Sequence, residues 1–150
     1  MSWREEADPQ VRDELDELLD VAIRAAQSKL DAAGAFYPFG LAMEGPGETR
    51  TVSPEVRTGP REIADVAQVF DQCWQRLQAE SESLAAVAVA SDVGGPDGDA
   101  IAVALEHRDG PSIEVFLPYA AQGKTNGKRP AQKHLYGELQ AAPGQPRIWA

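Results

Sequence analysis

Three stretches after residue 83 carry the clearest hydrophobic pattern in the chain. Residues 84–90 form an unbroken apolar run, whose length is typical of a strand buried on both faces. In residues 100–105 large aliphatic side chains alternate with alanines, and in residues 112–117 they occupy every second position. A period of two places those aliphatic side chains on one face of each strand. Asp109 and Gly110, between the second and third stretches, are a typical hairpin signal, so we predict an antiparallel meander.

The alanines of the first two stretches predict that the opposite face of the sheet carries only small side chains. They are Ala86, Ala88, Ala90, Ala100, Ala102 and Ala104. We expect the alanines of one strand to lie beside those of the next, so that another element can approach the sheet closely. That element is either one of the chain's own helices or a second subunit. In the second case the candidate dimer face is formed by Ala100, Ala102 and Ala104.

Two segments show the three- and four-residue spacing of amphipathic helices. The first starts at Asp8 and Pro9, which suit the N-cap and the first turn, and stops near Gly34. Its apolar stripe contains Val11, Leu15, Leu18, Leu19, Ala22, Ala26 and Leu30. The second opens at residues 58–60, and its stripe contains Ile63, Val66, Ala67, Phe70, Cys73, Trp74 and Leu77. Because Cys73 lies on this stripe, we interpret it as a buried hydrophobic residue and not as a nucleophile.

Shorter patterns complete the predicted fold. Residues 36–43 alternate as a strand, residues 49–53 return as a short strand, and residues 135–140 form a last edge strand. Residues 92–99 are rich in turn formers and predict a loop, and the tail, 141–150, is predicted to be irregular. The order is therefore α-β-β-α-β-β-β, with one further strand. It predicts a single α+β domain over residues 1–150, with an antiparallel sheet of five or six strands and two amphipathic helices on opposite faces.

Composition and charge narrow the possible partners and location of the protein. Hydrophobic residues make up 43% of the chain and charged residues 25%, as in ordinary globular proteins. The net charge of −10 opposes binding to nucleic acids and to anionic membranes. No apolar run approaches the roughly 18 residues of a membrane span, and the first residues do not resemble a secretory signal. We therefore expect a cytoplasmic protein that binds neither nucleic acid nor membrane.

The charges are distributed unevenly along the chain. The acidic residues Asp13, Asp16, Glu17 and Asp20 crowd the first half of the first helix. They form either a solvated face or a docking surface for a basic partner. Basic residues gather in 120–134, namely Lys124, Lys128, Arg129 and Lys133. The glycines and proline of that segment predict a mobile loop. This loop is either a solvent-exposed excursion or a contact site for an anionic group or an acidic partner surface, and Tyr119 is expected at the mouth of a ligand pocket beside it.

Motifs for known chemistries are incomplete. Gly123 and Lys124 resemble the end of a phosphate-binding loop, but Pro118 stands where that loop needs its first glycine. Two histidines and one cysteine offer few ligands for a catalytic metal. We predict no catalytic residue, no cofactor and no metal site.

Four short stretches carry a resemblance to other proteins. They are Phe36-Tyr37-Pro38-Phe39, Asp99-Ala100-Ile101, Leu105-Glu106-His107-Arg108 and Leu117-Pro118-Tyr119. With them the chain resembles small uncharacterised α+β proteins of actinobacterial type, some of which resemble immunity proteins paired with polymorphic toxins. The resemblance spans about residues 15–119; it implies a protein partner and brings no catalytic residue. The order of elements is also similar to that of roadblock-type modules, which are dimeric scaffolds.

Three functions follow from these observations. The first is a non-catalytic cytoplasmic protein-interaction module of immunity type, indicated by the acidic first helix. The second is a small ligand-binding protein or enzyme that uses the basic loop, 122–134, and Tyr119. The third is a homodimeric scaffold built on the alanine face. In the first and third cases the partner is another protein or a second copy of this chain.

Overall fold

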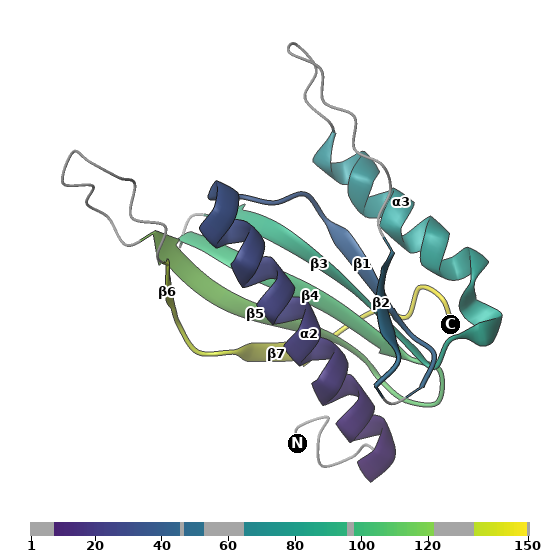
Figure 1. Cartoon of the computed structure of the whole chain (residues 1–150). Coiled ribbons are helices and arrows are strands. Elements are labelled where there is room, and N and C mark those ends of the chain that lie inside the picture. The colour runs from purple at the N-terminus through teal and green to yellow at the C-terminus, as the bar shows by residue number, and fades with distance from the viewer. Residues whose placement is uncertain (1–7, 46, 53–64, 96–97, 122–133, 150) are drawn as a thin grey trace, which may run out of the picture.

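The computed structural model describes residues 8–45, 47–52, 65–95, 98–121 and 134–149 (Figure 1). These residues form two α-helices, α2 (Pro9–Ala33) and α3 (Val66–Ala79), and a short 3₁₀ helix, η1 (Ser81–Ser83). The strands among the described residues are β1 (Phe39–Met43), β2 (Thr49–Val52), β3 (Ala86–Gly95), β4 (Gly98–His107), β5 (Ser112–Ala121), β6 (His134–Tyr136) and β7 (Gln140–Pro143).

All the strands belong to one antiparallel sheet. Their order is β2-β1-β3-β4-β5-β6, and β7 also pairs with β5. β6 lies along residues 119–121 and β7 along residues 113–116, so the two short strands share one edge of the sheet. The predicted α+β fold, with the order α-β-β-α-β-β-β followed by an edge strand, is confirmed.

Three predicted strand boundaries are wrong. The strand expected at 36–43 starts only at Phe39. The expected loop 92–99 is mostly strand, because β3 runs to Gly95 and β4 starts at Gly98. The expected edge strand 135–140 is divided into β6 and β7, and the tail is regular over Gln140–Pro143. Between the two short strands Gly137 donates its N–H to the carbonyl of Pro118 at 2.8 Å, so the chain stays beside β5 while its strand pairing is interrupted.

Helix α2 begins and ends where its sequence predicts. The Asp8 carboxylate accepts the N–H of Gln10 at 2.9 Å, and Pro9 occupies the first turn. At the other end Gly34 adopts the left-handed conformation, with φ of 78°, and donates its N–H to the carbonyl of Leu30 at 2.7 Å. Both ends thereby satisfy backbone groups that a helix leaves without an internal partner.

Helix α3 is described from Val66 onward, after an aspartate that caps it. Its N-cap is Asp65, whose carboxylate accepts the N–H of Ala67 at 3.0 Å. The predicted opening at 58–60 lies outside the described residues. Cys73 is fully buried in this helix, and its thiol donates to the carbonyl of Pro38 at 3.5 Å. Burial raises the pKa of the Cys73 thiol to about 11, which agrees with its interpretation as a packing residue.

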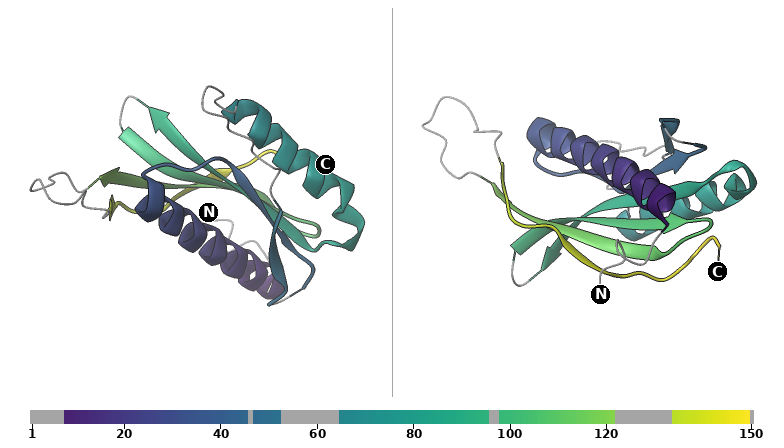
Figure 2. Two further views of the ribbon diagram at one scale, coloured as in Figure 1. Left: turned by 45° about the horizontal axis from the view of Figure 1, so that its top comes forward. Right: turned by 90° about the horizontal axis from the view of Figure 1, so that it is seen from below.

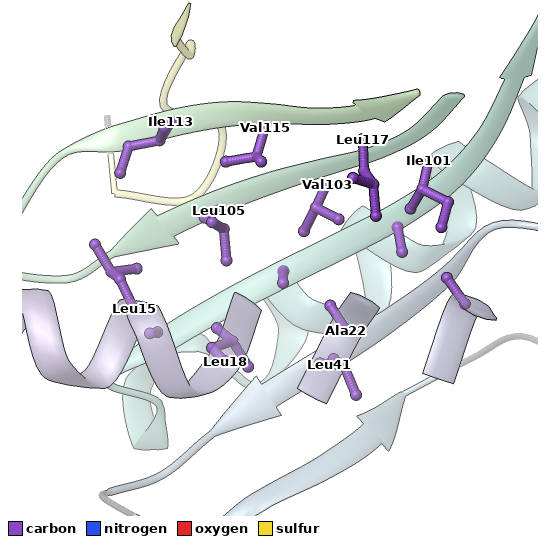
Figure 3. Close-up of a cluster of buried hydrophobic side chains, with 14 of the residues drawn as sticks. Leu15, Leu18, Ala22, Leu41, Ile101, Val103, Leu105, Ile113, Val115 and Leu117 are labelled. Carbon is purple, nitrogen blue, oxygen red and sulfur yellow. The ribbon is translucent and has the colours of Figure 1, made fainter. Parts of the chain in front are cut away.

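The sheet separates two hydrophobic clusters, and the helices lie on opposite faces as predicted (Figure 2). Helix α2 packs against β1, β3 and β4, whereas α3 packs against β1, β2 and β3. Figure 3 shows the α2 cluster, in which the labelled side chains are Leu15, Leu18, Ala22, Leu41, Ile101, Val103, Leu105, Ile113, Val115 and Leu117. The α3 cluster contains Ala42, Val52, Cys73, Trp74, Leu77, Leu84, Val87 and Val89. Burying each large aliphatic side chain contributes about 1.5–3 kcal/mol.

The alanines of β3 and β4 do not share a face, so that prediction is wrong. Ala88 lies opposite Leu105 and Ala90 opposite Val103, which turns Ala86, Ala88 and Ala90 toward α2. Ala104 instead lies opposite Val89, so Ala100, Ala102 and Ala104 are on the α3 side. The register places each alanine beside a larger residue, so small and bulky side chains sit next to one another on both faces of the β3–β4 pair.

The helices in the described part of the chain include none that is both long and apolar enough to cross a membrane.

Candidate functional site

A groove of about 620 Å³ runs between α2 and the chain around β6 and β7. Its apolar wall is formed by Leu19, Ile23, Leu117, Tyr136 and Leu139. Polar side chains on α2 complete it, namely Asp16, Asp20, Arg24 and Gln27. Leu139 is 53% exposed and lies with Leu19 and Ile23 in one apolar wall, so the hydrophobic surface here is contiguous. We call this feature the α2 groove.

The four acidic residues predicted as a docking surface divide between two hollows. Asp16 and Asp20 line the α2 groove. Asp13 and Glu17 line a separate hollow of about 400 Å³. Glu17 also accepts the N–H of Gly47 at 2.8 Å, so part of its role is to hold the β1–β2 turn. The acidic face therefore continues along α2, but only Asp16 and Asp20 adjoin the apolar wall of the groove.

An exposed ion pair lies at the edge of the α2 groove. Arg24 Nε is 3.1 Å from Asp20 Oδ2, one helical turn away, and both side chains are more than half exposed. Such a pair contributes little to stability, about 0.3–0.5 kcal/mol. A basic side chain from a partner can therefore replace Arg24 beside Asp20 at small cost.

Sequence reasoning missed the apolar half of this groove. Leu19 was assigned to the core stripe of α2, yet it is only partly buried and faces the groove with Ile23. The sequence pattern places Tyr136 and Leu139 in an edge strand, and it does not indicate which element their side chains face. The one sequence signal is that Ile23 lies outside the apolar stripe predicted for this helix, whereas no local pattern connects Leu139 with α2.

The basic candidates Lys124, Lys128, Arg129 and Lys133 lie outside the described residues, so the structure does not place them. Tyr119 is described, and its hydroxyl donates a hydrogen bond to Asp92 Oδ1 on β3. Burial, and then the Asp92 hydrogen bond, raises the pKa of Tyr119. The Tyr119 ring lies 6.5 Å from that of Tyr136, which lines the α2 groove. Tyr119 thus supports the wall of the groove and links β5 to β3.

The candidate dimer residues Ala100, Ala102 and Ala104 are each partly buried on the α3 side of the sheet. Ala102 and Ala104 line a hollow of about 200 Å³ over β3, β4 and β5. The structure describes one chain, so their role in a dimer stays a prediction.

Within the described ranges, no three histidine, cysteine, aspartate or glutamate side chains gather in a way that could hold a metal ion. The buried histidine His107 has both ring nitrogens in contacts within the chain. Its Nε2 is 2.9 Å from Glu14 Oε2, and its Nδ1 accepts the N–H of Asp109 at 3.0 Å. Neither nitrogen is therefore available to a substrate in this arrangement.

Comparisons of the chain with protein-family models, with curated proteins and with solved structures find no match.

Proposed function

We propose that the protein is a non-catalytic cytoplasmic protein-interaction module whose α2 groove binds a basic, partly apolar segment of a partner protein. The observation that supports this most directly is the combination of carboxylates on α2 with exposed Leu139 across the groove. Charged residues alone are common on surfaces, whereas an apolar wall with a charged edge is typical of interfaces.

The two halves of the groove have different roles in the proposal. Asp16 and Asp20 in the groove, and Asp13 and Glu17 in the neighbouring hollow, attract a basic partner and speed its association. Leu19, Ile23 and Leu139 supply most of the affinity, because they lose contact with water when the partner binds. The net charge of −10 favours the same class of partner.

An immunity-type role is the particular form of this function that the resemblance favours. An immunity protein needs a stable acidic or apolar surface that fits one toxin, and it needs no chemistry of its own. In this proposal the partner is a basic toxin domain encoded beside this protein.

The test is co-expression and co-purification with the protein encoded next to this one. Leu139→Asp should weaken binding about tenfold or more, because it places a charge on the apolar wall. The matched control is Val66→Asp on α3, since Val66 is 50% exposed and lies on the other side of the sheet. Equal binding by wild type and Leu139→Asp would contradict the proposal.

Salt dependence separates the two parts of the interface. Asp20→Asn should mainly slow association, and the difference from wild type should shrink as salt is raised. Light scattering of the purified chain alone shows whether the partner is a second copy instead, because self-association would double the mass without any added protein.

A further inference from the structure

The hollow on the α3 side of the sheet differs in chemistry from the α2 groove. Ala102 and Ala104 form its floor, and Phe70, Val93 and Phe116 contribute apolar walls. The space exists because β4 presents methyl groups on this face, while α3 packs over β1, β2 and β3. Its volume, about 200 Å³, is below the roughly 300 Å³ at which drug-sized pockets begin, so it suits a short ligand.

One carboxylate stands in this apolar surface. Glu114 lines the hollow and is only partly exposed. Among the described residues, none donates a hydrogen bond to the Glu114 carboxylate or forms an ion pair with it. A carboxylate that has lost part of its water and gains no partner is unfavourable, and a cation beside it removes that cost.

The aromatic residues around the hollow favour a cation as well. The guanidinium carbon of Arg147 lies 5.2 Å from the centre of the Phe70 ring and 5.1 Å from that of Trp74. Arg147 therefore already occupies these two rings, of which only Phe70 lines the hollow, so the aromatic contact for an added cation comes from Phe116. Phe116 lines the same hollow as Phe70 and brings a second aromatic side chain beside Glu114. Aromatic side chains with a carboxylate are a typical environment for alkylated ammonium groups.

We infer that this hollow binds a small organic monocation, namely an ammonium or methylated ammonium group with a short apolar body. The charged group lies beside Glu114 and the aromatic rings, and the apolar body lies over Ala102 and Ala104. A ligand of this size gives a dissociation constant of roughly 0.1–10 mM. The site is on the opposite side of the sheet from the α2 groove, so it does not depend on the proposed partner protein.

The experiment is an NMR titration of the ¹⁵N-labelled full chain at constant ionic strength. The probes are n-butyltrimethylammonium and n-butylammonium, with neutral 1-pentanol and anionic pentanoate as matched comparisons. The cations should cause saturable shifts in the amides of residues 102–104 and 114–116, and the neutral and anionic probes should bind at least tenfold more weakly.

Three variants test whether the cations bind in this hollow. Glu114→Gln removes the charge and should weaken cation binding about tenfold or more. Ala102→Leu keeps the charge but fills the hollow, and it should weaken binding similarly. Glu82→Gln changes an exposed carboxylate on η1 and should bind like wild type. The amide spectrum of each variant reports whether it is folded. If Ala102→Leu does not fold, the result for Glu114→Gln alone decides whether the cations bind in the hollow.

Several results would overturn the inference. Equal binding of 1-pentanol and the cations would show an apolar hollow without charge recognition. Unchanged binding by Glu114→Gln would show that the carboxylate is not part of the site. A dimer in light scattering, with no shifts on titration, would assign the hollow to a second copy of the chain.

Discussion

Glu14 and His107 form a buried pair that joins helix α2 to the end of strand β4. Their side chains are 8% and 5% exposed, and Glu14 Oε2 lies 2.9 Å from His107 Nε2. Because Nδ1 of His107 accepts the N–H of Asp109, its Nε2 carries the proton and donates to the carboxylate. Gln10 donates to the other Glu14 oxygen at 3.1 Å. The chain thus accommodates a carboxylate on the buried side of α2 by supplying two donors.

Breaking this pair should destabilise the fold strongly. His107→Ala leaves the Glu14 carboxylate short of a donor in a buried position, at a cost of about 3 kcal/mol. Urea denaturation measures the change. Arg24→Ala is the control, since it breaks an exposed ion pair on the same helix and should cost less than about 1 kcal/mol. Equal effects of the two substitutions would show that the buried pair is not a stabilising contact.

The two sets of alanines should respond differently to enlargement. Ala88 is 1% exposed beneath α2, so Ala88→Leu should overpack the core and cost about 1–3 kcal/mol. Ala102 faces the open hollow on the other side, so Ala102→Leu should change stability by only about 0.5 kcal/mol. Thermal or urea unfolding of both variants checks this. Similar losses at the two positions would contradict the described register of β3 and β4.

Glu106 should hold the C-terminal segment in place. Its buried carboxylate accepts backbone N–H groups from Arg147 at 2.5 Å, Ile148 at 2.9 Å and Trp149 at 2.6 Å. Glu106→Gln replaces one acceptor oxygen by a donor that opposes those N–H groups, at a cost of about 1–3 kcal/mol. Hydrogen exchange at Ile148 and Trp149 should become faster.

The control for Glu106 is the other carboxylate on the same face of the sheet. Glu114→Gln should leave exchange at residues 147–149 unchanged, because among the described residues no contact joins the Glu114 side chain to them. Unchanged exchange in Glu106→Gln as well would mean that the segment is held by Ile148 and Trp149 packing alone.

Cys73 should be chemically inert in the folded protein. Its thiol is fully buried, and with a pKa of about 11 roughly one molecule in a thousand carries the thiolate at pH 8. Iodoacetamide should therefore label Cys73 in urea and hardly at all in buffer. Labelling in buffer at the rate of a free thiol peptide would show that α3 opens readily from the sheet.

Local patterns in the sequence determined which segments form helices and strands. The period of two in 100–105 and 112–117, and the caps of α2 at Asp8 and Gly34, depend on neighbours along the chain and were predicted correctly. The apolar run 84–90 also predicted that the two helices lie on opposite faces, because a strand that is apolar on both sides needs a packed element on each face. The acidic face of α2 was found in the same way, since its residues lie within three turns.

Only the tertiary structure decided which residues meet across elements. The register of β3 and β4 separated the two sets of alanines, and a shift of one residue would have joined them. The contact of Glu14 with His107 spans 93 positions in the chain, and the α2 groove likewise brings Leu139 and α2 to one hollow from distant segments. Such contacts depend on how whole elements pack, and no local periodicity records that packing.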